Sequence, residues 1–186
     1  IAVDQTSFKS RLQTAITGYP DSLRELVAEL PKDRVPDRED QQCAWELYIE
    51  LQTRIATQPL HYLDGDEATA LESLVTVFRT VREVCRKAGP RATTSLRVAE
   101  FLLNDVLRPT TARWHKRKIA GKLNPEDLRR EFRSELKRLQ PQIAGITAVF
   151  YVIATIAGDE PCPAQKTVAG GPKGQQPTFP DLVYDR

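Results

Sequence analysis

A basic cluster in the second half of the chain contains the side chains best suited to bind a ligand. The cluster comprises Arg108, Arg113, Trp114, His115, Lys116, Arg117 and Lys118. Clustered cations can pair with phosphates, and an indole can stack on a base or lie against a cation. This pattern is consistent with binding of an anionic ligand or a nucleic acid. Because no nucleic-acid fold motif accompanies it, we prefer the alternative of a solvated surface loop with Trp114 packed at the edge of the fold.

Further cations follow in the next helical pattern, mostly on one side. They are Arg129, Arg130, Arg133, Lys137 and Arg138. Glu131 and Glu135 lie between them and can form ion pairs with neighbours one helical turn away. An exposed, ion-paired helix face is therefore the preferred interpretation. The alternative is a docking strip for an acidic partner, to which Arg130, Arg133 and Lys137 would contribute.

The residue types in this chain give little support for a metal site or a catalytic site. Glu46, Glu50 and Glu72 raise the question of a metal site inside a helical bundle. Such sites pair glutamates with Glu-x-x-His motifs, which this chain lacks, and His61 and His115 are its only histidines. No nucleophile elbow, phosphate loop or dinucleotide fingerprint is present either. We therefore expect no catalytic residue, no metal and no cofactor, and a non-enzymatic protein.

The basic region ends abruptly in an uncharged segment. From Arg108 to Arg138 there are eleven Lys or Arg against four acids, whereas residues 141–158 carry no charge. This apolar segment continues the stripe that begins at Leu128, which favours the central helix of a soluble bundle. Its 18 residues also approach the length of a membrane span, and Asp159 and Glu160 follow it, so a membrane-associated regulator using 142–158 remains an alternative.

Helical periodicity dominates the chain, and strand signals are nearly absent. Apolar residues recur at helical spacing in six segments, bounded by Asp4 and Gly18, Asp21 and Pro31, Asp37 and Thr57, Asp66 or Asp64 and Gly89, Thr93 and Pro109, and Asn124 and Gly158. Pro109 should break or kink the fifth segment. The fold class expected is all-α, a bundle of about five or six helices spanning residues 1–158. Residues 159–186 are rich in Pro and Gly and read as an extended or flexible tail.

Composition limits the remaining possibilities. The 186 residues are 40% hydrophobic and 28% charged, with a net charge of +2, as in ordinary soluble domains. Cys43, Cys85 and Cys162 are odd in number and widely spaced, which argues against a disulfide scaffold and for a reducing compartment. We expect a cytoplasmic protein.

Two stretches resemble an uncharacterised bacterial family of all-helical domains. The first runs from Trp45 to Leu60, and the second joins Leu107, Arg108 and Pro109 to Trp114 and His115. The resemblance covers roughly the middle half of the chain. It implies a recurrent bacterial module that works beside partner proteins, and it carries no activity, cofactor or catalytic residue.

These observations favour a non-enzymatic protein–protein interaction or adaptor domain. The first alternative is a helical domain that binds an anionic ligand or nucleic acid through the basic region 108–138. A buried Arg54 or Arg108 paired with Glu46, Glu50 or Glu100 would hold the register of such a bundle. The sequence identifies neither the partner nor the oligomeric state.

Overall fold

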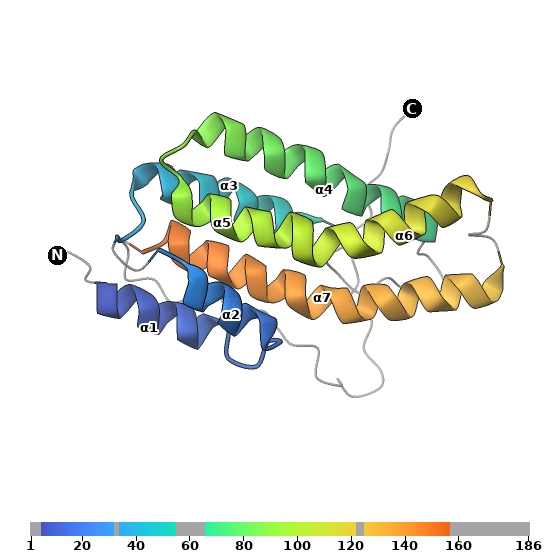
Figure 1. The fold of residues 1–186 in the computed structure, drawn as a ribbon, viewed down its shortest axis with the longest axis horizontal. Coiled ribbons are helices and arrows are strands. Elements are labelled where there is room, and N and C mark those ends of the chain that lie inside the picture. Colours follow the sequence, from blue (N-terminus) through green and yellow to red (C-terminus); the bar gives the residue numbers. More distant parts are fainter. Residues whose placement is uncertain (1–4, 32–33, 55–65, 122–124, 157–186) are drawn as a thin grey trace, which may run out of the picture.

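The structure is a computed structural model that describes residues 5–31, 34–54, 66–121 and 125–156. Every regular element in these ranges is helical: α1 (Gln5–Ala15), α2 (Ser22–Glu29), α3 (Arg38–Thr53), α4 (Glu67–Ala88), α5 (Thr93–Phe101), the π-helical segment η2 (Leu102–Leu107), α6 (Arg108–Ile119) and α7 (Glu126–Ala154). Because α5, η2 and α6 follow one another without a break, the described residues form six helical rods (Figure 1). The prediction of an all-α bundle of five or six helices is confirmed.

The core is organised around α7. This helix packs most extensively against α3 and also contacts α1, α5 and η2, with α1 and α2 on one side of it and α3 to α6 on the other (Figure 1). Almost every side chain from Ile143 to Ile153 is buried. The uncharged segment is therefore mostly core from Ile143 to Ile156, as the continuous apolar stripe predicted, whereas Pro141 at its start is exposed.

No helix in the described ranges combines the length and hydrophobicity needed to cross a membrane. The predicted tail at 159–186, the expected cap Gly158 and Asn124 lie outside the described residues.

Local capping signals place several helix ends correctly. The side chain of Asp37 accepts a hydrogen bond from the backbone N–H of Asp40 at 3.1 Å, and Asp66 accepts one from Thr69 at 2.7 Å. These bonds satisfy donors that a helix start leaves without partners. Helix α4 ends at Gly89, whose φ of 76° lies in the region that favours glycine. The third predicted helix is shorter than expected and ends at Thr53.

The helix does not break at Pro109, because the helical rod continues through this residue. The π-helical segment η2 ends directly before α6, and the N–H of Arg108 donates to the carbonyl of Leu103, five residues earlier. This wider turn shifts the hydrogen-bond register, so Pro109 lies in the first turn of α6. The proline removes one backbone hydrogen bond from the rod, and it follows directly after the wider turn that ends at Arg108. The cluster around Trp114 consequently lies on a helix and not in a loop.

Gly145 lets α2 approach α7 closely. A Cβ built on Gly145 would lie 2.1 Å from Cδ1 of Leu23 and 3.0 Å from Cγ of Tyr19. Leu23 is fully buried, and the nearest atoms of Tyr19 lie close to its backbone. Neither neighbour can therefore move away cheaply.

We expect Gly145→Ala to lower the free energy of unfolding by about 1–2 kcal/mol, because overpacking outweighs the better helix propensity of alanine. Urea unfolding followed by circular dichroism measures the change. A Leu23→Ala background removes the closest of these contacts and leaves those with Tyr19, so the same substitution should cost less there. Equal costs in the two backgrounds would contradict the close contact.

Candidate functional site

Most of the predicted basic surface is neutralised within the fold. Six of the ten described Lys and Arg residues between 108 and 138 form ion pairs: Arg113, Arg117, Lys118, Arg129, Arg130 and Arg133. Their partners are Glu67, Glu72, Glu126, Glu131 and Glu135. The sequence predicted ion pairs within the last helix. Such pairs occur in α7, but ion pairs that join α6 or α4 to α7 outnumber them. These cations hold helices together and are less available to a ligand.

Glu67 shows how strongly this network is embedded. Its side chain is almost fully buried at the start of α4 and accepts hydrogen bonds from Arg133 and, at 3.1 Å, from Arg129. Burial alone would raise the pKa of Glu67, but hydrogen bonds from Arg133, its own backbone N–H and Arg129 outweigh burial and lower that pKa. A carboxylate held in this way fastens the N-terminal end of α4 to α7.

Trp114 is a core residue. Its side chain has no exposed surface, its ring meets Phe132 edge to face at 5.1 Å, and its indole N–H donates to Glu135 at 2.9 Å. The guanidinium of Arg117 lies 4.6 Å from the ring centroid. Every face that could have stacked on a base is therefore occupied, and the structure contradicts a role for Trp114 in ligand stacking. The preferred interpretation, in which the indole packs into the bundle, holds.

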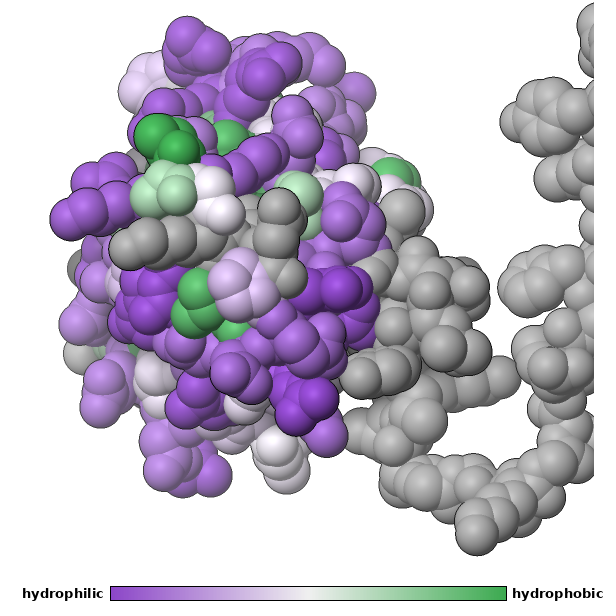
Figure 2. All heavy atoms as spheres, turned by 90° about the vertical axis from the view of Figure 1, so that its right-hand side faces the viewer, coloured by the Kyte–Doolittle hydropathy of each residue, from purple (hydrophilic) through white to green (hydrophobic). Residues whose placement is uncertain are grey.

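The other candidate residues are exposed. Arg108, Lys116, Lys137 and Arg138 form no ion pair with any residue in the described ranges, and His115 is also exposed. Figure 2 looks onto the end of the bundle where α6 ends and α7 begins, and the side chains in view are mostly hydrophilic. The proposed register pair between Arg108 and a glutamate is thus absent, whereas Arg54 does pair with Glu50 and also donates to Thr80 of α4 at 3.2 Å.

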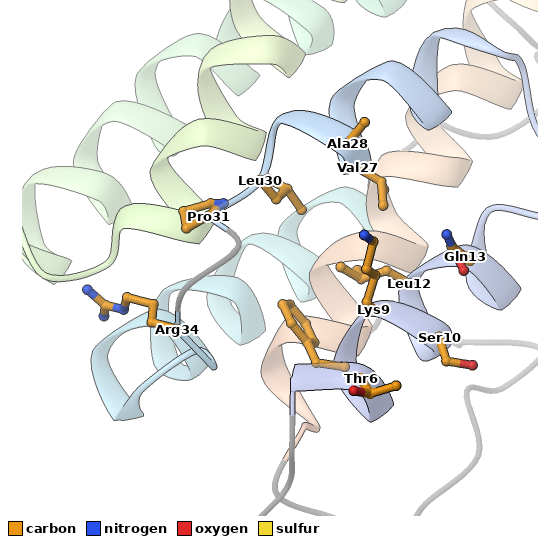
Figure 3. Close-up of a pocket in the computed structure, with 11 residues that line it drawn as sticks. Thr6, Lys9, Ser10, Leu12, Gln13, Val27, Ala28, Leu30, Pro31 and Arg34 are labelled. Carbon is orange, nitrogen blue, oxygen red and sulfur yellow. The ribbon is translucent and has the colours of Figure 1, made fainter.

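A different site, not found in the sequence, lies between α1 and α2. Two adjoining pockets of about 510 and 450 Å³ share Lys9, Gln13, Val27 and Ala28 and form one depression, called here the α1–α2 groove. Its apolar lining consists of Phe8, Leu12, Ile16, Val27 and Leu30. Figure 3 shows Lys9 rising from α1 toward α2. A lone lysine between core positions gives no sequence signal, which is why the groove was missed.

The groove exists because α1 and α2 are each fixed to α7 by separate contacts. Arg11 of α1 donates to the carbonyls of Thr155 and Ile156 at 3.3 and 3.4 Å, where the end of α7 leaves acceptors without helical partners. Helix α2 is held at Gly145 by Leu23. Between these two attachments, α1 and α2 make few contacts with each other. The space between them is left for another molecule.

The charged side chains among the described lining residues of the groove are all cations. Its lining includes the cations Lys9, Arg24 and Arg34, and no Asp or Glu among the described residues lines either pocket. Arg24 pairs with Asp21 at 2.8 Å and Arg34 with Asp37 at 2.6 Å. Lys9 has no ion pair with any described residue, so it is the cation best placed to meet a bound acidic group.

The described residues contain no cluster of three or more metal-ligating side chains suited to a metal ion. Comparison with known proteins adds no functional assignment, and the bacterial family resemblance stays a prediction. No family model, no curated protein and no solved structure matches this chain.

Proposed function

We propose that this chain is a helical interaction domain that binds an acidic, amphipathic segment of a partner protein in the α1–α2 groove. The observation that carries the proposal is the combination of an apolar lining with three cations and no acid among the described lining residues. Helical grooves of this kind bind partner helices through apolar anchors, and surrounding charge selects the partner. The proposal keeps the non-enzymatic interaction role expected from the sequence and gives it a location.

The dimensions of the groove suit a polypeptide. Its lining extends from Thr6 to Thr17 on the α1 side, a span of about 16 Å at the helical rise per residue. Such a length accommodates about three turns of a bound helix. A groove shared by two helices and extended in this way fits a partner segment better than a compact metabolite, which is usually enclosed by its site.

Charge and apolar contact have different roles in this proposal. Phe8, Leu12 and Leu30 are already almost fully buried, so the apolar area removed from water on binding is mainly that of the partner's side chains, and this area supplies the affinity. Lys9 lies at the surface, where an ion pair adds little affinity but favours acidic partners and speeds their encounter. Loss of its charge should therefore weaken binding less than reversal of that charge.

The test is a selection of random peptides of about 12 residues, the length of three helical turns, against the full chain. We expect the selected peptides to combine acidic residues with large apolar ones at helical spacing. Their affinity, measured by fluorescence anisotropy, should fall about tenfold or more in Lys9→Glu, which places like charges together. Lys9→Met should retain most of the affinity.

Lys116→Glu is the matched control, since it reverses an exposed lysine on α6 that has no ion pair with a described residue. Equal loss of peptide binding in Lys9→Glu and Lys116→Glu would contradict the groove.

A second candidate function is the binding of an anionic ligand or nucleic acid. It is supported by four exposed cations without an ion pair to the described part of the chain: Arg108, Lys116, Lys137 and Arg138. Binding of an oligonucleotide that is salt-sensitive, lost in Lys116→Glu and kept in Lys9→Glu would favour that candidate instead.

A further inference from the structure

Two cysteines far apart in sequence meet between α3 and α4. The thiol of Cys43 is buried, that of Cys85 is partly exposed, and both are free. The two side chains contact each other closely enough that each is the largest influence on the pKa of the other. Just beside them, Glu46 of α3 forms an ion pair with Lys87 of α4 at 3.2 Å, which keeps the two helices together at this point. The sulfur atoms are thus held as neighbours by the packing of two helices.

A pocket of about 430 Å³ opens next to this pair. Its described lining includes Cys43, Glu46, Val84, Lys87 and Ala88 but not Cys85. The pocket therefore borders Cys43, whereas Cys85 is reached through its own partly exposed side chain. A hydroperoxide group is small enough to enter such a space. Most buried cysteines are inert because reagents cannot reach them, and this arrangement removes that obstacle.

We propose that Cys43 and Cys85 are a modification site, at which a hydroperoxide converts the two thiols into a reversible disulfide between α3 and α4. This site is separate from the α1–α2 groove and does not depend on the proposed function.

The two thiols have different roles in the reaction. The hydrogen bond from Cys43 lowers the pKa of Cys85, although burial and the nearby Glu100 oppose this shift. Hydrogen bonding to Cys85 and burial raise the pKa of Cys43. Because the thiolate is the nucleophile, Cys85 reacts first and Cys43 follows as the resolving thiol.

The reaction balances in two steps. The Cys85 thiolate attacks the terminal oxygen of the hydroperoxide, the O–O bond breaks, and the departing oxygen takes a proton to leave as an alcohol, or as water from hydrogen peroxide. Cys85 is then a sulfenic acid. The Cys43 sulfur attacks the Cys85 sulfur, the S–O bond breaks, and water leaves with the Cys43 proton. The two thiols are oxidised together, and one hydroperoxide is reduced.

The experiment uses the full chain with Cys162→Ser, so that only the two paired cysteines remain. After treatment with hydrogen peroxide, we expect the intact mass to fall by two hydrogen atoms and a protease digest to contain one linked peptide pair. A phosphine reductant should restore both thiols. In glutathione redox buffers, the disulfide should be about tenfold or more favoured in the folded chain than in urea, because the fold holds the sulfurs together.

Single variants test the order of the steps. With Cys43→Ser, Cys85 should stop at the sulfenic acid and be trapped by dimedone, whereas with Cys85→Ser, Cys43 should remain unlabelled. A disulfide no more favoured in the folded chain than in urea would overturn the proposal. So would peroxide treatment that leaves both thiols titratable. These two measurements use the Cys162→Ser chain alone and do not depend on the folding of the single variants.

Discussion

Trp114→Ala should lower the free energy of unfolding by about 3–5 kcal/mol, among the largest effects of any single substitution in this chain. The indole is fully buried, contacts Phe132 and donates to Glu135. Alanine removes this volume and leaves a cavity between α6 and α7, and Glu135 loses a donor in a position that is only 13% exposed. Chemical unfolding followed by circular dichroism measures the difference.

Trp45→Ala is the matched control, because Trp45 is the other tryptophan of the chain and is 42% exposed on α3. Its ring stacks on Tyr48, so we expect a smaller loss, about 1 kcal/mol. Each variant retains one tryptophan, so fluorescence reports Trp114 and Trp45 separately. Trp114 should emit at shorter wavelength and resist quenching by iodide. Similar losses of stability in the two variants would contradict the burial of Trp114.

Asp40→Ala should destabilise the fold by about 2–3 kcal/mol, because Asp40 caps α5 from a neighbouring helix. Its carboxylate accepts from the backbone N–H of Ser95 at 2.8 Å, and the Ser95 hydroxyl donates to the Asp40 carbonyl, also at 2.8 Å. Asp40 and Ser95 are both fully buried. Helix α5 has no capping side chain of its own at Ala92, so alanine at 40 leaves a buried N–H without a partner. Urea unfolding measures the loss.

Asp40→Asn separates the hydrogen bond from the charge, because asparagine keeps an oxygen that can accept from Ser95. Burial raises the pKa of Asp40 above 3.8, and the opposing hydrogen bond from Ser95 and the nearby Arg34 do not cancel that shift. The folded state then binds more protons than the unfolded state, so this group stabilises the fold fully below pH 3.8 and loses that contribution as the pH rises through its folded-state pKa.

Unfolding curves measured at a series of pH values from 3.8 upward test this linkage. In the wild type, the contribution of Asp40 should lower the free energy of unfolding as the pH rises, and in Asp40→Asn this part of the pH dependence should be absent. We expect Asp40→Asn to be less destabilising than Asp40→Ala at neutral pH. Equal destabilisation by asparagine and alanine would show that the oxygen facing Ser95 contributes nothing.

The helices of this fold could be predicted because their signals are local. Asp37, Asp66 and Gly89 lie within a few residues of the helix ends that they define. The periodic stripe of α7 continues through Pro141 and correctly indicates a helix that passes from the surface into the core. Such signals depend on the spacing of neighbours along the chain, which the sequence contains in full.

The contacts that hold the helices together could not be predicted in this way. Asp40 and Ser95 are 55 positions apart, and Glu67 and Arg133 are 66 apart. An acid in the first turn of a helix ordinarily faces water, so nothing nearby in the sequence marks Asp40 or Glu67 as buried. For the same reason, the run of cations between residues 108 and 138 suggested a ligand-binding surface, because most of the glutamates that pair with these cations lie on other helices. The α1–α2 groove also depends on how two helices are fixed to a third.

The π-helical segment η2 sets the rotation of everything that follows it in the same rod. Leu102, Val106, Thr110 and Trp114 are buried at strict intervals of four, a spacing that drifts around a regular helix of 3.6 residues per turn. The wider turn of η2 absorbs part of this drift. Loss of one residue from Leu102–Leu107 would turn α6 by about 100°. The length of this short segment, and not only its composition, therefore directs Trp114 to Glu135 and the arginines of α6 to their glutamates on α7.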